Sequence, residues 1–160
     1  MDSLVEAMII EGVRTAVGKR NGVLSRIRSE DLAAEPLREL IQRTGIDASL
    51  IDDVILGCVT QIGEQGGVIG RQAALIAGYP MEVPGTTIDR QCGSSQQAVH
   101  FAAQAIISGD MEVVVAGGVE SMTRVPMFSN RKGVDYSERL SAQYEMINQG
   151  LSAELIAEKW

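Results

Sequence analysis

The stretch TTIDRQCGSSQQAVHFAAQAI, residues 86–106, holds the features that decide how the chain is interpreted. A β-branched, extended segment delivers Cys92 to the start of a helix of small apolar residues, and Gly93, Ser94 and Ser95 follow directly. Free cysteine is among the most often buried residues, so packing is one explanation. The other is chemical, because a helix start favours a thiolate and Gly93 leaves space for a carbonyl group to approach. The spacing alone leaves both explanations open.

The segments around this stretch alternate between strand-like and helix-like patterns. Four short apolar segments are predicted strands, over residues 7–15, 51–62, 83–91 and 111–122. A helix is predicted to begin at Ser29 as its N-cap and to end at Gly45, and another spans residues 93–110 and ends at Gly109. This alternation predicts an α/β fold, in which helices cover a largely parallel sheet.

Two helical segments carry unusual features. Pro36 lies inside the first helical pattern, where it either kinks the helix or marks its true start. Residues 63–80 read as a Gly-rich loop that enters a short helix, and the glycines favour a mobile loop over a dinucleotide site. The helix over 93–110 is apolar nearly all round, so it requires a large sheet or a cover from outside the chain.

Composition narrows the class of protein. The 160 residues are 45% hydrophobic and 22% charged, which is typical of a globular domain. The net charge of -7 and the lack of a Lys/Arg cluster argue against nucleic acid as a partner. Two cysteines are too few for a disulfide framework or a structural zinc site, and no metal is expected. Without a signal-peptide pattern or a long apolar run, the expected location is the cytoplasm, away from a membrane.

If Cys92 is a nucleophile, the chain offers no obvious base for it. The single histidine, His100, lies eight residues later on the same predicted helix. That separation is about 12 Å along the axis and about 80° around it, beyond hydrogen-bond reach. His100 is therefore interpreted as a core or interface residue. Cys58, on an apolar strand, is interpreted as a core residue.

The last part of the chain differs from the rest. From about Ser121 the pattern has scattered charges and no strong period until LSAELIAEKW, residues 151–160, which predicts a helix capped by Ser152. That pattern stops at Trp160 without a C-cap signal, which favours a truncated chain.

Three segments, in order, carry a specific resemblance to a family. EGVRTAVGK, DRQCGSSQQAVHFAAQAI and VVVAGGVESMTRVPM resemble the N-terminal portion of a thiolase, an acyl-CoA acyltransferase. The resemblance implies the N-terminal half of a thiolase-like layered fold over residues 1–120, with residues 121–160 opening a CoA-binding loop domain. It also implies Claisen condensation of acyl-CoAs, or thiolysis of a 3-ketoacyl-CoA, with coenzyme A as co-substrate and no permanently bound cofactor.

The resemblance assigns roles to individual residues. It makes Cys92 the acylated nucleophile, with its N–H as half of an oxyanion hole, and Gly93 a substrate-binding position. Leu140 and Asn148 become candidates for CoA binding, although Asn148 and Gln149 stand where the family has His and Met. The histidine base and the second cysteine of the family belong to a C-terminal half outside these residues.

The resemblance further implies a homodimer or homotetramer that acts on acyl-CoA substrates. Two alternatives stay open: a non-catalytic fragment that only dimerises or binds CoA weakly, and a condensing enzyme of the ketoacyl-synthase kind. Because these residues supply no partner base, we expect the chain alone to show negligible turnover.

Overall fold

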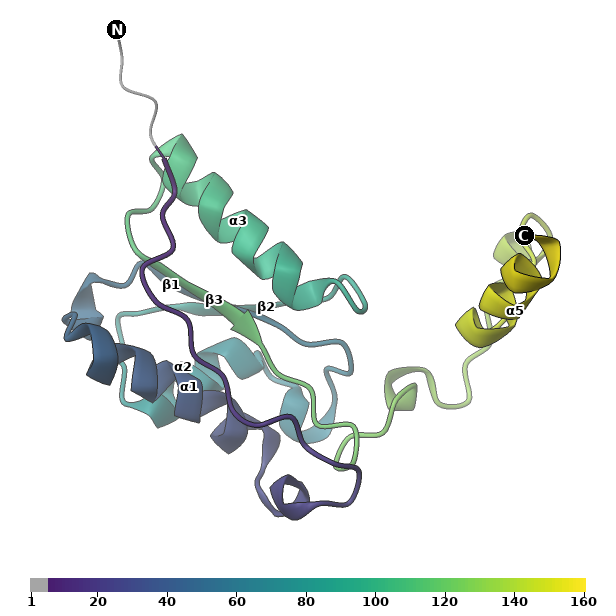
Figure 1. The fold of residues 1–160 in the computed structure, drawn as a ribbon, viewed down its shortest axis with the longest axis horizontal. Coiled ribbons are helices and arrows are strands. Elements are labelled where there is room, and N and C mark those ends of the chain that lie inside the picture. Colours follow the sequence, from purple (N-terminus) through teal and green to yellow (C-terminus); the bar gives the residue numbers. More distant parts are fainter. Residues whose placement is uncertain (1–5) are drawn as a thin grey trace, which may run out of the picture. The chain divides into compact units, whose positions relative to one another are not determined.

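The computed structural model describes residues 6–160, which fall into two compact units, one up to Asn130 and one over Arg131–Trp160. The first unit holds a sheet between helices (Figure 1). Its three strands are β1 (Asp53–Gly57), β2 (Gly85–Ile88) and β3 (Val114–Gly118). They are parallel and lie in the order β2-β1-β3. The predicted α/β fold is confirmed.

Helices cover both faces of this sheet (Figure 1). On one face lie α1 (Ser29–Thr44) and α2 (Ile69–Ala77), and on the other lies α3 (Ser94–Ser108). Val54 and Leu56 of β1 join the core formed with α1 and α2, whereas Ile55 packs against α3. The central strand is therefore buried on both faces, which explains its unbroken apolar sequence.

Glycines end the helices and bring α2 close to the sheet. Gly45 and Gly109 follow α1 and α3 in the left-handed conformation, with φ of 67° and 78°, as predicted. A Cβ at Gly70 would overlap the carbonyl oxygen of Thr86, so the Gly-rich stretch lies against β2. Pro36 lies in the interior of α1 and is not its start.

The strand predicted over residues 7–15 is wrong. These residues form no strand, and Met8, Ile9 and Ile10 are 74%, 86% and 81% exposed. The outer strands of the sheet are β2 and β3, and within the described residues no backbone hydrogen bond joins residues 7–15 to either of them. Local alternation predicts extended backbone, but a strand also needs backbone hydrogen bonds to a neighbour.

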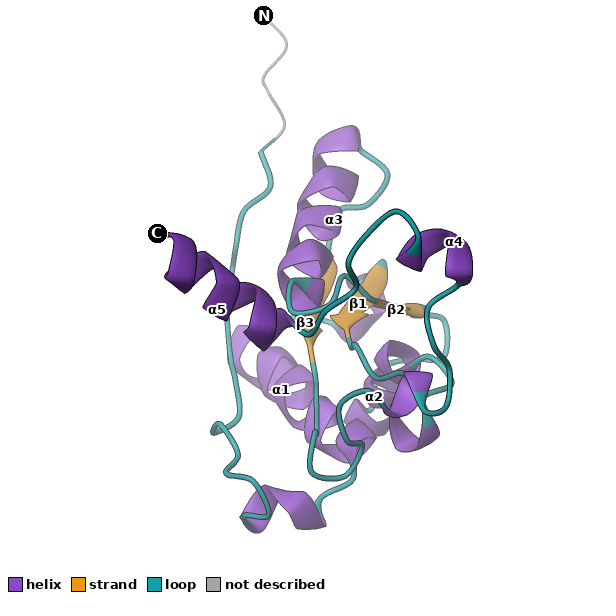
Figure 2. Cartoon of the chain, turned by 90° about the vertical axis from the view of Figure 1, so that its right-hand side faces the viewer, coloured by secondary structure: helices purple, strands orange, loops and turns teal. Residues whose placement is uncertain are grey.

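The second unit contains α4 (Glu138–Ser141) and α5 (Gln149–Lys159), which Figure 2 labels. The prediction that Ser152 caps α5 is wrong, because Ser152 lies inside the helix. Asn148 Oδ1 instead accepts from Gly150 N–H at 2.8 Å, an N-cap geometry that asparagine favours. Short 3₁₀ turns occur at Val23–Arg26, Ala48–Leu50, Gly63–Gln65 and Ser129–Arg131. Among the described residues, none of the helices is both long and apolar enough to span a bilayer.

Candidate active site at the carboxyl edge of the sheet

The three parallel strands end at the same edge of the sheet. Residues 58–65 follow β1, residues 89–93 follow β2 and residues 119–124 follow β3. Loops at this edge of a parallel sheet commonly form ligand sites. The turn that carries Cys92 is one of these three loops.

Local hydrogen bonds fix the Cys92 turn. Gln91 has a φ of 49°, a conformation that costs a non-glycine residue about 1–2 kcal/mol. Asp89 Oδ1 accepts from Gln91 N–H at 2.7 Å. Ser94 Oγ accepts from Arg90 N–H at 2.9 Å and donates to Gln91 C=O at 2.6 Å. The buried Ser94 therefore supports the turn, and the strained residue lies directly before Cys92.

Cys92 is a free and exposed thiol, so the packing explanation for it is wrong. Within the described part of the chain, its backbone N–H donates no hydrogen bond. The next residue, Gly93, has a φ of -92°, and a Cβ there would come only to 3.5 Å from Arg90 C=O. The fold itself would therefore accept a side chain at position 93, and the space in front of the thiol is left open.

Two other glycines hold the start of α3 against the sheet. A Cβ at Gly57, the last residue of β1, would overlap the backbone between Ser94 and Ser95. A Cβ at Gly118, the last residue of β3, would overlap Ser95 Oγ. Glycine is required at both positions, because only bare backbone allows the helix that follows Cys92 to come so close.

Cys58 has the opposite character to Cys92. It is 1% exposed, and burial, followed by the nearby Glu120 carboxylate, raises the pKa of its thiol to about 12. The prediction of a core cysteine is confirmed. Its backbone N–H donates to Ile88 C=O at 3.0 Å, which joins the end of β1 to the end of β2.

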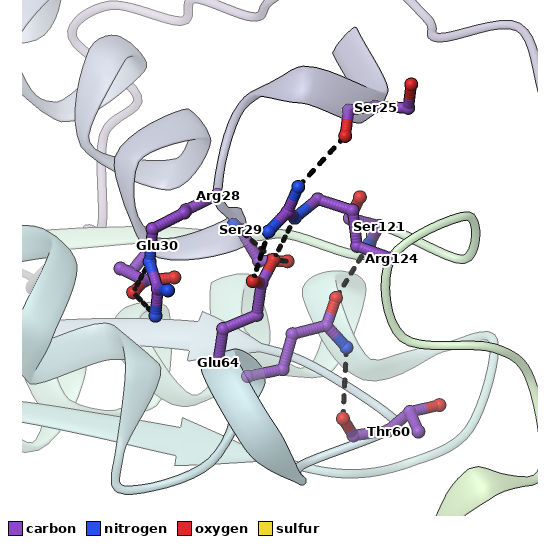
Figure 3. Close-up of polar contacts among 9 residues, drawn as sticks. Ser25, Arg28, Ser29, Glu30, Thr60, Glu64, Ser121 and Arg124 are labelled. Carbon is purple, nitrogen blue, oxygen red and sulfur yellow. Dashed lines mark hydrogen bonds and ion pairs between the residues drawn. The ribbon is translucent and has the colours of Figure 1, made fainter. Parts of the chain in front are cut away.

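A charged cluster links the loops after β1 and β3 to the start of α1 (Figure 3). Glu64 accepts from Arg124 Nε at 2.6 Å and from Ser29 N–H and Oγ at 2.9 and 2.8 Å. Arg124 also donates to Ser25 C=O at 3.0 Å. The Arg124 hydrogen bond is the main cause that lowers the pKa of Glu64 to about 2. The prediction that Ser29 is the N-cap is therefore wrong, because its hydroxyl donates to Glu64 instead of accepting from the helix. The Glu64 carboxylate itself accepts from the Ser29 N–H at the start of α1, where a negative charge is favourable.

A second polar cluster lies beside the first. Gln65, which is 0% exposed, donates to Glu120 Oε1 at 2.7 Å and to Thr60 C=O at 3.0 Å, and accepts from Ser121 N–H at 2.7 Å. Figure 3 shows Thr60 and Ser121 at the two ends of these bonds. Glu120 Oε2 accepts from Val59 N–H at 2.8 Å. Sequence patterns did not predict either cluster, and the only local signal was charged and amide residues placed among glycines, in GEQGG and AGGVES.

The other predicted residues lie on α3 and in the second unit. His100 is exposed on α3, so its interpretation as a core residue is wrong, whereas a place in an interface stays a prediction. In the second unit, Leu140 is half-buried in α4 and Asn148 caps α5. Their proposed contact with CoA stays a prediction.

A hollow lies elsewhere in the first unit. It measures about 770 Å³ and lies between residues 13–20, α1 and the segment from Val115 to Thr123. Cys92 does not line it, and its thiol is exposed. Within the described chain, no three His, Cys, Asp or Glu side chains gather closely enough to hold a metal ion.

Comparison with known proteins identifies the class to which this fold and turn belong. Residues 7–160 match the thiolase family in its N-terminal domain. The chain is 49% identical to a steroid 3-ketoacyl-CoA thiolase of Mycobacterium tuberculosis, over 98% of this chain and 41% of that protein. It is 50% identical to a 3-oxoadipyl-CoA/3-oxo-5,6-dehydrosuberyl-CoA thiolase of Escherichia coli, over 84% and 34%. A 3-ketoacyl-CoA thiolase of Pectobacterium carotovorum is 44% identical, over 94% and 39%.

The chain therefore belongs to the thiolase family, and the predicted resemblance is confirmed. It spans less than half the length of these relatives.

Proposed function

We propose that the chain carries the nucleophile of an acyl-CoA C-acyltransferase of the thiolase type. The observation that carries this proposal is Cys92 itself, an exposed thiol on a strained strand-to-helix turn at the carboxyl edge of a parallel sheet. Such a turn presents a nucleophile away from the backbone that holds it. The names of the relatives, which are thiolases for several 3-oxoacyl-CoA compounds, support the reaction class.

In the proposed reaction the Cys92 thiolate attacks C3 of a 3-ketoacyl-CoA. The C2–C3 bond then breaks, C2 takes a proton and leaves as acetyl-CoA, and the remaining acyl group stays on sulfur. The thiolate of a second CoA attacks the acyl-cysteine and releases a shortened acyl-CoA and the Cys92 thiolate. The condensation reaction is the reverse of these steps. The free N–H of Cys92 would stabilise the oxyanion formed at each attack.

The neighbouring residues support these steps in different ways. Gly93, where the fold would accept a side chain, keeps the path to the sulfur open for a thioester. Ser94 holds the turn through Arg90 and Gln91. Leu140 and Asn148 remain candidates for CoA binding, and residues 121–160 are proposed as the opening of a CoA-binding loop domain. We also propose that the chain acts on acyl-CoA in the cytoplasm, as part of a homodimer or homotetramer.

A second candidate is a non-catalytic chain that only dimerises or binds CoA weakly. It is favoured by His100, the single histidine, because that side chain lies beyond the reach of Cys92 on the predicted helical spacing and is exposed. The two candidates differ in whether Cys92 accepts an acyl group.

Intact mass spectrometry of the purified chain before and after exposure to acetyl-CoA tests the proposal, with peptide mapping of the product. We expect one acetyl group on Cys92 and none on the buried Cys58. The variant Cys92→Ala should take up no acetyl group, and Gly93→Ala should fold normally but acylate at least tenfold more slowly, the scale on which a displaced reactant costs rate. An unmodified Cys92 in the folded chain, or an adduct only at another residue, would overturn the proposal.

A further inference from the structure

We propose that Glu120 is a positioning residue for the Cys92 turn, and that it acts through the peptide between Cys58 and Val59. This inference rests on the proposed role of Cys92 as the nucleophile. Glu120 lies two residues after β3 and makes no hydrogen bond to the turn itself. Its effect is therefore transmitted across the sheet, from β3 through β1 to β2.

The Glu120 carboxylate faces donors on both of its oxygens. Oε2 accepts from Val59 N–H at 2.8 Å and lies 4.0 Å from the sulfur of Cys58, which burial keeps as a thiol. Oε1 accepts from Gln65 Nε2 at 2.7 Å. Together these contacts hold the first two residues after β1 against the end of β3.

The chemical identity of residue 120 is fixed by its surroundings. Ser121 N–H donates to Gln65 Oε1, and Gln65 Nε2 also donates to Thr60 C=O, so the amide cannot be reversed without losing both bonds. Gln65 must then present its NH₂ group to residue 120. With the amide facing one oxygen and Val59 N–H facing the other, only a group that accepts on both oxygens is satisfied. That group is a carboxylate.

The neighbouring peptide, between Gly57 and Cys58, then holds the strand that leads into the turn. Cys58 N–H donates to Ile88 C=O at 3.0 Å, at the end of β2. The next residue, Asp89, accepts from Gln91 N–H and so fixes the strained residue before Cys92. Glu120 thus holds Val59, the neighbouring Cys58 holds Ile88, and Ile88 leads into the turn.

The competing interpretation is that Glu120 only holds the loops after β1 and β3 together. In that case the loss of Glu120 would loosen only residues 58–65 and 119–124, and the Cys92 turn would be unchanged. The two interpretations therefore differ in whether the loss of Glu120 loosens residues 89–94.

The experiment compares three forms of the chain: wild type, Glu120→Gln and Glu112→Gln. Glu112 is exposed and its carboxylate has no hydrogen-bond partner among the described residues, so Glu112→Gln removes the same charge without touching the cluster. Amide hydrogen exchange is followed in peptides that cover residues 88–95, together with the alkylation of Cys92 and Cys58. We expect E120Q to speed exchange at residues 89–94 roughly tenfold and to change the Cys92 alkylation rate, with Cys58 still protected. E112Q should match wild type.

The double variant E120Q/Q65E restores the pairing of a carboxylate with an amide, with the carboxylate now at position 65 and the amide at position 120. It should bring exchange at the Cys92 turn part of the way back towards wild type, because the Thr60 C=O bond is still lost. Gln65→Met is the matched comparison, because it removes one partner of Glu120 but leaves the bond to Val59. We then expect faster exchange in residues 58–65 but not at the turn.

Unchanged exchange at residues 89–94 in E120Q would overturn the proposal in favour of contacts that hold only the two loops. Equal loosening of the turn in E120Q and Gln65→Met would also overturn it, because the effect would then not depend on the bond between Glu120 and Val59. Neither exchange nor alkylation uses acyl-CoA. If Cys92 does not accept an acetyl group, the exchange and alkylation results still decide the role of Glu120. The two proposals can therefore fail independently.

Discussion

Glu64 joins two segments that are distant from it in the sequence. It accepts from Ser29, which lies 35 residues earlier, and from Arg124, which lies 60 residues later. Its side chain is 11% exposed and that of Arg124 is 28% exposed, so water screens this pair less than an open surface pair. The contact supplies both a partner for Arg124 and the missing acceptor at the start of α1.

We expect Glu64→Gln to lower the free energy of unfolding by about 2 kcal/mol at neutral pH, the scale of charge-assisted hydrogen bonds in a partly buried site. The pKa of Glu64 is about 2 in the folded chain and lies near 4.3 in an unfolded one. Its stabilising effect is therefore complete above the unfolded value and is lost as the pH falls towards 2. Urea unfolding of both forms at neutral pH and near pH 2 measures the difference.

The matched control for this variant is Glu39→Gln. Glu39 forms an exposed i,i+4 pair with Arg43, which is worth about 0.3–0.5 kcal/mol. A difference between wild type and E64Q that stays constant from neutral pH to pH 2 would contradict the assigned pKa. A loss in E64Q no larger than that in E39Q would contradict the role of Glu64 in stability.

At the scale of elements, periodicity in the sequence was enough to place α1, α2, α3 and the three strands of the sheet. It was not enough for residues 7–15, because alternation describes how one segment could be buried and says nothing about whether its backbone pairs with a neighbouring strand. It also missed Gln65 and Glu120, because their hydrogen bonds join residues 55 positions apart and leave no local pattern. The position of Cys92 on its turn was predictable because strand, turn and helix start are adjacent in the sequence.

The adjacent glycines at the end of β3 give a matched test of how α3 is held. A Cβ at Gly118 would overlap Ser95 Oγ and come within 2.6 Å of Gly57 C=O, whereas a Cβ at Gly117 would meet only Leu56 Cδ2, at 3.7 Å. We expect Gly118→Ala to lower the free energy of unfolding by about 3 kcal/mol through overpacking. Gly117→Ala should change it by less than about 1 kcal/mol.

Thermal or urea unfolding of the two glycine variants measures this difference. Cys92 should also be alkylated at a changed rate in Gly118→Ala, because the start of α3 has to move. Equal stability of the two variants would contradict the close approach of α3 to the sheet.

At the scale of the whole molecule, the 160 residues hold one histidine, and it is exposed on α3. A general base typically contributes about 10²–10⁴-fold to such a reaction. We therefore expect negligible thiolysis of acetoacetyl-CoA by the chain alone, even where Cys92 accepts an acetyl group. The assay follows the loss of acetoacetyl-CoA with a mass-verified preparation and Cys92→Ala as the blank. Thiolysis clearly above that blank would contradict this expectation.

The dependence of α1 on Glu64 and Arg124 has a consequence for the order in which the chain folds. Closing loops of 35 and 60 residues costs entropy before the contacts are gained. During synthesis α1 emerges before Glu64 and Arg124, so its first turn stays without its carboxylate until Glu64 emerges, and Arg124 is needed to hold that carboxylate in place. The start of α1 is thus completed only after residues that follow it by 35 and 95 positions have left the ribosome.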